Sequence, residues 1–483
     1  MKIRSVKFNF IMNFILTASS FIFPLITAPY IYRVLQPEAT GRVDFVASII
    51  TYFITFASLG IPTYGIRACA RVRDDKEKLS KVVQELMIIN TTTMGIAYVV
   101  FLLLLSIVPE FRAERDLMMI NSISMVLNVI GVNWFYNGIE QYAYITTVSI
   151  VCKAISIVFM FLMVKSPTDY VIYGAITVFA GSASYILNFV NLRKFISFRK
   201  TGKYEFKKHV RPILVFFSMS AAISIYTNLD TVMIRFIKGN TEVGYYSAAI
   251  KVKNLLVSLI TSLGAVLLPR LSYVVEKGDK EIFKSIIEKA FNFVLLIGLS
   301  VSVYFTLFAR ESILLLSGSS YTNSILPMML LMPAVLFIGL SNITGIQVLT
   351  PNGMERKVLY SILAGAALNI CLNLVLIPRH GASGAALATT LAELVVLIVQ
   401  IVFLRDMMRE MVKRISIGKN LLAAIVATGI TLIIMSLIDT PIFITLVISA
   451  ILFFGVYVVV LIITKEKFVN ETILGFIKNK RLK

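Results

Sequence analysis

Runs of about twenty apolar residues, separated by short polar segments, recur along the whole chain. A helix of about 20 apolar residues crosses the roughly 30 Å hydrocarbon core of a bilayer. The pattern therefore predicts an all-α polytopic membrane protein with about 14 transmembrane helices. The predicted spans are 9–32, 43–65, 83–107, 117–137, 142–164, 170–190, 212–236, 244–268, 287–309, 325–348, 357–378, 382–404, 420–438 and 442–463.

Composition supports this class and excludes others. The 483 residues are 58% hydrophobic and only 15% charged, and the longest polar stretch, Asn191 to Arg211, is too short for a soluble domain. The formal net charge of +21 could suggest a nucleic-acid partner, but the positive residues lie in short loops between spans. That distribution is typical of topology signals and of contact with anionic membrane lipids, so we expect no nucleic acid.

The positive loops also predict the orientation. When the predicted spans alternate, 35 of the 47 Lys and Arg residues fall on one side of the membrane, eight on the other and four within spans. Because Lys and Arg concentrate in cytoplasmic loops, this bias predicts an even number of spans and both termini in the cytoplasm. The first apolar run has no small-residue cleavage site after a short core, so we expect it to be retained as a span.

The chain contains an internal repeat. Residues 32–48 parallel residues 234–250, with Arg33 matching Arg235 and Gly41 matching Gly244 after a one-residue gap, and residues 74–81 parallel residues 278–285. The repeat predicts two six-helix lobes of the same orientation, and transporters with such parallel repeats bind substrate between the halves. The expected domains are 1–200, 201–415, and 416–483, the last holding two additional helices and a basic cytoplasmic tail.

Charged residues within spans are the candidate functional residues, because a charge in the bilayer is costly and usually faces a cavity or a partner. Lys251 and Lys253 lie near the middle of one span, with Lys251 ~12 Å from its start at 1.5 Å per residue. They differ by about 200° around a helix, so only one can face a given cavity, and we favour Lys251. An ion pair between Lys251 and Asp230 is the competing interpretation.

Arg33 and Arg235 lie near the outer ends of two equivalent spans. Their guanidinium groups could bind phosphate bidentately, or they could simply reach the headgroups at the interface. Lys153 and Glu393 each lie near the middle of a span without a charged partner one turn away, and Glu393 is a candidate proton or cation site. Asp44 could pair with these cations or only cap its helix.

The sequence indicates no catalytic or metal site and no cofactor. Cys69, Cys152 and Cys371 are far apart and have no metal or redox spacing. His209 and His380 lie in predicted loops, where we expect them to be solvated. Pro24 and Pro29 interrupt the first span and predict kinks there, since an internal proline removes a backbone hydrogen bond.

Several segments match a known family. The run PYIYRVLQPEATGRVDFVASIITYFITFASLGIPTYGIRACARVRDDKEKLSK resembles the start of bacterial polysaccharide repeat-unit flippases of the Wzx type, in the multidrug/oligosaccharidyl-lipid/polysaccharide exporter superfamily. Further matches fall in order along nearly the whole chain: NWFYNGIEQYAYIT, NLDTVMI, VGYYSAAIKV, LLPRLSYVVEKGDKE, PNGMERK and LIPRHGASGAALATTLAE.

The resemblance implies two helix bundles around a central cavity lined chiefly by spans one, two, seven and eight. It implies a cargo of undecaprenyl-pyrophosphate-linked oligosaccharide, moved to the outer leaflet of the bacterial plasma membrane, with polysaccharide polymerase and chain-length machinery as candidate partners. In related peptidoglycan-precursor flippases, cationic residues in those spans are needed. Arg33, Arg235 and Lys251 fall near such positions and Asp44 near a matching acid, although a lysine cannot bind phosphate as a fork.

Three rival functions predict different features. A drug or organic-cation antiporter of the same superfamily predicts acids as the principal intramembrane charge, whereas cations outnumber acids here. A membrane-bound glycosyl- or acyltransferase needs catalytic residues on large loops, and the loops are too short. A scaffold without transport leaves the intramembrane lysines unexplained. The sequence therefore favours a flippase that is not an enzyme and that works by alternating access.

Overall fold

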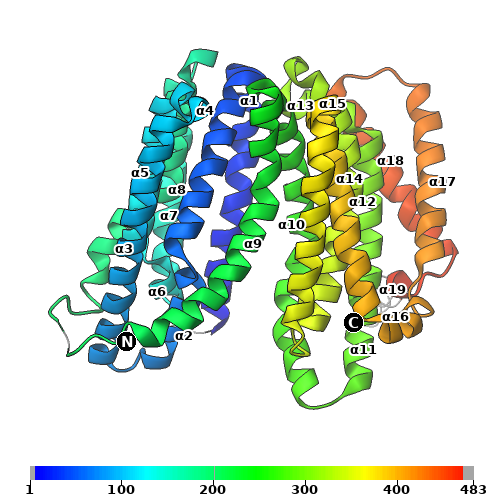
Figure 1. The fold of residues 1–483 in the computed structure, drawn as a ribbon. Helices are drawn as coiled ribbons and strands as arrows, with labels where there is room; N and C mark the ends of the chain where they lie inside the picture. The colour runs from blue at the N-terminus through cyan, green and yellow to red at the C-terminus, as the bar shows by residue number, and fades with distance from the viewer. Residues whose placement is uncertain (1–5, 201, 471–483) are drawn as a thin grey trace. The chain divides into compact units, whose positions relative to one another are not determined.

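The computed structural model describes residues 6–200 and 202–470, so the predicted basic tail after residue 470 and the first five residues lie outside the described part. Every regular element in the described residues is a helix, which confirms the predicted all-α membrane fold (Figure 1). Eleven stretches of the described residues are long and apolar enough to cross a membrane. The predicted count of fourteen spans stays a prediction.

Two of these stretches each contain two predicted spans. α1 runs from Val6 to Ser58 and leaves helical geometry at Gln36 (φ 65°, ψ 168°). α15 runs from Glu355 to Phe403 and leaves it at Gly381 (φ 53°, ψ −129°). Gln36 precedes a proline, and proline disfavours helical geometry in the residue before it. α1 therefore leaves helical geometry just before Pro37, between the predicted spans 9–32 and 43–65, and the kinks predicted at Pro24 and Pro29 stay predictions.

The chain forms two compact units, Met1–Gly244 and Tyr245–Lys483. In the first unit α1 is followed by shorter helices and ends with α9, which packs along α1 (Figure 1). These helices are α2 (Ile61–Val72), α3 (Lys76–Ile107), α4 (Pro109–Ala113), α5 (Arg115–Gly131), α6 (Asn133–Gly138), α7 (Tyr142–Met163), α8 (Tyr170–Leu192) and α9 (Lys207–Lys238). We call its two ends the α4 end and the α2 end.

The local sequence explains how the helices pack at the α2 end. The Asp75 carboxylate accepts hydrogen bonds from the backbone N–H groups of Glu77 and Lys78 and so caps α3. Trp134 of α6 packs against Gly65 of α2, where an added Cβ would lie 2.5 Å from the indole ring. The short helix α6 therefore docks closely on α2, which gives the NWFYNG segment a structural role.

A tight turn joins α9 to the next helix and packs against α1 at the α4 end. α9 ends before Gly239 (φ 96°), and α10 (Asn240–Glu276) begins directly after it. An added Cβ on Gly41 would lie 1.8 Å from the carbonyl oxygen of Asn240. We call residues 36–42 together with residues 239–244 the α1–α9 corner.

The second unit contains most of α10 and the remaining helices. They are α11 (Lys280–Val294), α12 (Ser300–Leu307), α13 (Ala309–Ser317), α14 (Ile325–Asn342), α15, α16 (Arg405–Val412), α17 (Ile417–Ser436), α18 (Ile442–Ile463) and α19 (Lys467–Val469). Turns of π-helix lie at Leu295–Leu299 and Ile343–Leu349. The hairpin α17–α18 packs on α12, where the Tyr304 hydroxyl donates to the Leu446 carbonyl at 2.8 Å.

Candidate functional site

Arg33 and Arg235 both lie in the first unit but have different surroundings. Arg33 is exposed on α1, and its Nη1 donates to the Pro29 carbonyl at 2.8 Å. Arg235 is half-buried on α9, with its Cζ 5.6 Å from the centroid of the Phe45 ring on α1. Its Nε is buried and has no hydrogen-bond partner in the described residues. Arg235 is therefore held by an aromatic face, which suits a guanidinium group.

Lys153 lies on α7, facing α1. Its Nζ donates to the hydroxyl oxygens of Ser19 at 2.9 Å and Ser20 at 3.0 Å. Neutral hydroxyls orient an ammonium without neutralising it. The positive charge of Lys153 thus stays within the membrane-spanning part of the first unit.

The acidic candidates of the first unit lie on α9 and α1. Asp230 of α9 is buried and acts electrostatically on Tyr52 of α1. The Tyr52 hydroxyl also donates to the Ile225 carbonyl at 3.4 Å, so this tyrosine links the two helices. Asp44 is half-buried on α1, beside Phe45, on which Arg235 stacks.

The remaining candidates lie in the second unit. Lys251 is half-buried and Lys253 is buried on α10, and which of them faces a cavity stays a prediction. Glu393 is buried on α15. One turn before it, Thr389 hydrogen-bonds the Tyr246 hydroxyl of α10 at 2.9 Å.

Sequence reasoning missed a buried cluster at the α2 end, and the expectation for His209 was wrong. His209 is 2% exposed; its Nε2 lies 2.7 Å from Glu85 Oε2 and its Nδ1 2.8 Å from the Tyr64 hydroxyl. Lys208 Nζ lies 3.1 Å from the same Glu85 oxygen, and the Glu205 backbone N–H donates to the other oxygen. His209 is buried because it lies in the first turn of α9, which packs on α2, and its ring contacts Glu85 of α3, whereas His380 is exposed as predicted.

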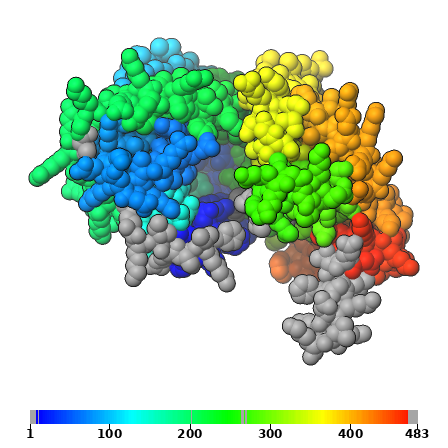
Figure 2. Space-filling model, turned by 90° about the horizontal axis from the view of Figure 1, so that it is seen from below, coloured from blue at the N-terminus to red at the C-terminus, as the bar shows by residue number. Residues whose placement is uncertain are grey.

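A signal for this cluster was present in the sequence. Glu85 follows Val82 and Val83 and precedes Leu86 in the first turns of α3, and all three apolar neighbours are buried. A carboxylate among buried apolar residues needs a partner. Figure 2 shows this end of the unit, where segments near residues 70 and 205 lie side by side.

A second missed cluster lies at the α4 end. Glu114, between α4 and α5, is 3% exposed, and its Oε1 accepts a hydrogen bond from Asn240 Nδ2 at 3.3 Å. Arg42 Nη1 lies 3.6 Å from the same oxygen. No sequence pattern pointed to Glu114, because it stands in a short polar loop between two spans.

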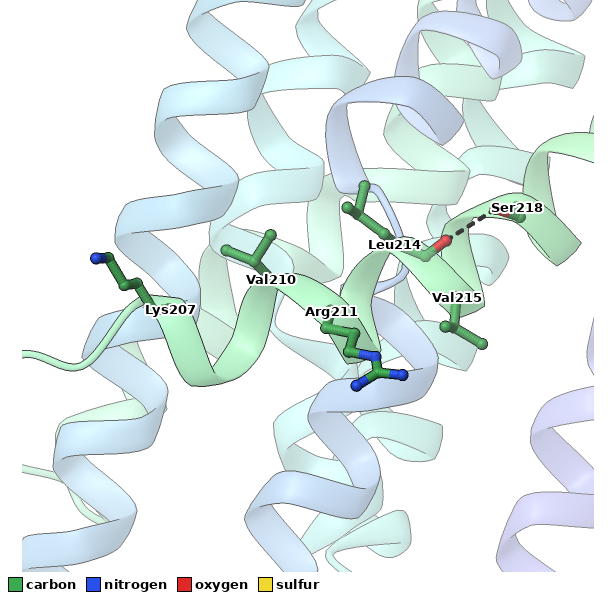
Figure 3. A pocket seen from close by; sticks show the side chains of 6 residues that line it. All are labelled: Lys207, Val210, Arg211, Leu214, Val215 and Ser218. Atoms are coloured by element: carbon green, nitrogen blue, oxygen red, sulfur yellow. Dashed lines mark hydrogen bonds between the residues drawn. The ribbon is translucent and has the colours of Figure 1, made fainter.

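The exposed face of α9 near the α2 end borders a shallow, open hollow of about 520 Å³ (Figure 3). Its lining combines two cations with aliphatic side chains: Lys207, Val210, Arg211, Leu214, Val215 and Ser218. These residues recur at helical spacing, so they share one face of α9. The described residues hold no group of three His, Cys, Asp or Glu side chains that could bind a metal ion.

Comparison with known proteins identifies a family match and relatives of this chain. Residues 6–275 match the family described as polysaccharide biosynthesis protein. A protein of Escherichia coli K12, provisionally named an O-antigen transporter, is 27% identical over 417 residues, which cover 83% of this chain and 97% of the relative.

Solved structures share the fold. The lipid II flippase MurJ in its inward closed conformation matches with a TM-score of 0.74 at 16% identity, over 94% of this chain and 98% of the other. An inward-facing multidrug resistance MATE family transporter matches with a TM-score of 0.63 at 14% identity, over 81% and 95%. With more than half of its length matched, the chain belongs to the polysaccharide biosynthesis protein family of membrane transporters.

Proposed function

We propose that this protein flips undecaprenyl-pyrophosphate-linked oligosaccharide repeat units from the cytoplasmic to the outer leaflet of a bacterial plasma membrane. The observation that carries the proposal is the excess of cations on the membrane-spanning helices: Arg33, Lys153, Arg235, Lys251 and Lys253. Cations in a low-dielectric setting attract a pyrophosphate strongly. The family and the name of the E. coli relative support the same cargo class.

We propose that the α2 end faces the cytoplasm. Arg67, Arg71 and Arg73 belong to or follow α2, and Lys207 and Arg211 begin α9 at the same end. Positive residues beside spans concentrate on the cytoplasmic side. With this orientation both termini are cytoplasmic and the α4 end faces outward.

In this proposal the pyrophosphate and sugars move through hydrated, cationic surroundings while the polyprenyl chain stays in lipid. Arg235, fixed over Phe45, offers a rigid fork for phosphate oxygens, and Lys251 and Lys153 offer point charges. The predicted lobes 1–200 and 201–415 would alternate between inward-facing and outward-facing states, with 416–483 as supporting helices. No covalent step is part of the proposal, and a polymerase and chain-length machinery are the expected partners downstream.

The hollow on α9 supports an amphiphilic cargo. Lys207 and Arg211 lie at the cytoplasmic end of this face, and Val210, Leu214 and Val215 line its remainder (Figure 3). A lipid with an anionic headgroup and an apolar chain would place its negative charge beside the cations of this face and its chain beside the aliphatic residues. The hollow is thus suited to a polyprenyl pyrophosphate entering from the cytoplasmic leaflet.

An ion-coupled antiporter of drugs or organic cations is the alternative, because MATE transporters share the fold. It needs acids to hold its cargo. The intramembrane acids Asp230 and Glu393 are both buried, whereas Arg33 is exposed and Lys251 is half-buried, so the cations are the more accessible charges. The charge available to a ligand therefore favours an anionic cargo.

The test is leaflet translocation of a fluorescent polyprenyl-pyrophosphate oligosaccharide in proteoliposomes. We expect wild type to flip the lipid, and Arg235→Ala and Lys251→Ala to lose at least about tenfold in rate, since a charge-assisted hydrogen bond contributes ~1.5–3 kcal/mol. Arg310→Ala, which removes an exposed cation on α13, is the matched control and should retain the rate.

The two functions give opposite results in the same liposomes. Flipping by wild type and loss in both variants, with normal folding, support the flippase. A wild type that moves no lipid-linked sugar but exports a cationic dye under an ion gradient overturns it in favour of the antiporter.

A further inference from the structure

The first unit joins two distant segments through two ion contacts of opposite direction. Lys81 Nζ of α3 lies 2.7 Å from Glu205 Oε1, just before α9. Four residues after Lys81, the Glu85 carboxylate is buried, and its Oε2 lies 3.1 Å from Lys208 Nζ and 2.7 Å from His209 Nε2 in the first turn of α9. α3 thus supplies a cation and an anion, and the start of α9 supplies the opposite charges. We call these five residues the α3–α9 latch.

The second unit contains the same arrangement, built from other residues. Lys284 Nζ of α11 lies 2.7 Å from Glu410 Oε2 of α16. Four residues after Lys284, the Glu288 carboxylate is buried, and it lies 3.8 Å from Arg414 Nη1 and 2.6 Å from Lys467 Nζ of α19. Figure 1 shows α11, α16 and α19 at the same end of the second unit. We call these five residues the α11–α16 latch.

The two latches follow the same order along the chain. An aspartate caps each helix, Asp75 on α3 and Asp279 on α11, and the lysine follows six residues later in the first unit and five in the second. Each lysine pairs with a glutamate far along the chain, 124 residues later in the first unit and 126 in the second. The two aspartates match in the sequence repeat of residues 74–81 and 278–285, so both halves of the repeat carry the latch.

The buried glutamate contributes most to each latch. Glu85 is 0% exposed and Glu288 is 7% exposed. Glu85 also accepts a hydrogen bond at 2.7 Å from the backbone N–H of Glu205. Separating the segments would leave a buried carboxylate without its partners, which is strongly destabilising, whereas the partly exposed lysine pairs contribute little by themselves. Opening either latch is therefore unfavourable.

Each latch fastens the segment by which the chain leaves one half of the repeat. The α3–α9 latch holds the first turn of α9, the helix that follows the six predicted spans of the first lobe. The α11–α16 latch holds the connection from α16 to α17, where the Ser416 backbone N–H also donates to Asn292 Oδ1 at 3.1 Å. Lys467 follows α18, so this latch ties the C-terminal hairpin to α11 as well.

We propose that both latches stay closed while the protein flips its cargo. The first turn of α9 then moves together with α3, and α16 and the end of the C-terminal hairpin move together with α11. The alternation between inward-facing and outward-facing states takes place without separation of these segments. The transport part of this inference rests on the proposed flippase function, whereas the latches themselves do not.

Hydrogen–deuterium exchange of the full-length protein in nanodiscs tests the latches without any cargo. Lys284→Glu places a carboxylate beside Glu288 and Glu410, so peptides covering residues 405–416 should exchange several-fold faster than in wild type. Adding Glu410→Lys restores the opposite charges and should return exchange toward the wild-type rate. Lys289→Glu, an exposed position on the same helix, is the matched control and should exchange like wild type.

The same design applies to the first unit. Lys81→Glu should speed exchange of peptides covering residues 205–215, and Lys81→Glu combined with Glu205→Lys should return it toward wild type. Exchange that stays at the wild-type rate in both single variants, or that the second change does not restore, would overturn the latches. Should Lys284→Glu fail to fold, Lys284→Gln removes the cation without adding a charge and must still speed exchange.

Cross-linking tests whether the latches stay closed during transport. In a protein with the exposed Cys371 replaced by alanine, the pairs Lys81→Cys/Glu205→Cys and Lys284→Cys/Glu410→Cys are joined by a short bifunctional thiol reagent in proteoliposomes. These changes leave the contacts of both buried glutamates with their cations in place. We expect each cross-linked protein to flip polyprenyl-pyrophosphate oligosaccharide at the rate it had before cross-linking, as should single-cysteine variants treated in the same way.

The possible results separate the latches from the proposed function. A rate that falls on cross-linking of either pair, but not in the single-cysteine variants, would mean that the latch must open and would overturn the proposal. If wild type flips no lipid, the flippase function fails, and the exchange results alone decide whether the latches hold these segments together.

Discussion

Gly41 and Gly244 make reciprocal contacts in the α1–α9 corner. A Cβ added to Gly41 would lie 1.8 Å from the carbonyl oxygen of Asn240, and one added to Gly244 would lie 2.0 Å from that of Pro37. Gly41 lies four positions after Pro37, and Gly244 lies four positions after Asn240, so each glycine contacts the carbonyl that lies one helical turn before the other glycine. The predicted repeat matches the same two glycines, and two turns related by such a repeat would meet in this way.

Adding a methyl group to either glycine should force the corner apart. Alanine is favoured over glycine inside a helix by about 1 kcal/mol, but overpacking a close contact costs ~1–3 kcal/mol, so the clash wins. We expect Gly41→Ala and Gly244→Ala each to lower the thermal unfolding midpoint, followed by fluorescence of the single tryptophan, Trp134.

Gly95→Ala is the matched control for this pair, since nothing lies within 4 Å of its added Cβ. It should keep or raise the midpoint. A corner variant that unfolds at the wild-type temperature would mean that the two backbones separate at little cost.

The fold class could be predicted from hydrophobic run length alone, because bilayer thickness fixes the length of a span. The break in α1 falls between the predicted spans 9–32 and 43–65, so the hydrophobic runs located it to that short segment. Pro24, Pro29 and Pro37 all fall in α1, and only the residue before Pro37 leaves helical geometry, where the chain turns at the α4 end.

The intramembrane charges were visible as exceptions to an apolar pattern, which is why Lys153, Asp230 and Glu393 could be named from the sequence. Their partners could not be predicted, because nothing in the sequence around a serine shows that it contacts a lysine on a distant helix. Glu114 and His209 were not predicted, because both stand in polar segments of the sequence and are buried only by tertiary packing.

Removing His209 should destabilise the α2 end strongly. His209→Ala leaves the buried carboxylate of Glu85 with Lys208 and one backbone donor, and breaking a buried pair costs ~3–5 kcal/mol. We expect a large drop in the unfolding midpoint and faster exchange of peptides covering residues 205–215.

His380→Ala, which removes the exposed histidine, should leave the midpoint unchanged. Glu85→Gln combined with His209→Ala should destabilise less than the sum of the single changes, because the uncompensated charge is gone. Strict additivity of the two changes would contradict a pair that acts as a unit.

Stability should depend on pH through Glu114. Its pKa is raised in the folded state, so the folded protein binds the proton more tightly than the unfolded chain does. The free energy of unfolding contributed by this group is therefore highest below the unfolded pKa of about 4.3 and falls as pH rises through the folded pKa.

Comparing wild type with Glu114→Gln isolates this effect from other titrating groups. The difference in unfolding midpoint should favour the variant at pH 8 and shrink or reverse toward pH 5. The opposite slope, with wild type gaining on the variant as pH rises, would mean that Arg42 and Arg235 outweigh burial.

The Lys153→Met variant distinguishes a structural role of Lys153 from a role in transport. The half-buried ammonium of Lys153 donates to the hydroxyls of Ser19 and Ser20, and a charge within the membrane is costly, so an apolar side chain of similar length removes that cost. We expect Lys153→Met to fold with an unchanged or higher unfolding midpoint, yet to flip polyprenyl-pyrophosphate oligosaccharide more slowly, because the attraction to the pyrophosphate is lost. Lys165→Met, which removes an exposed lysine after the same helix, should retain the rate. A Lys153→Met protein that flips at the wild-type rate would leave this lysine with only its contacts to α1, and the cationic path would then depend on the remaining candidates, Arg33, Arg235, Lys251 and Lys253.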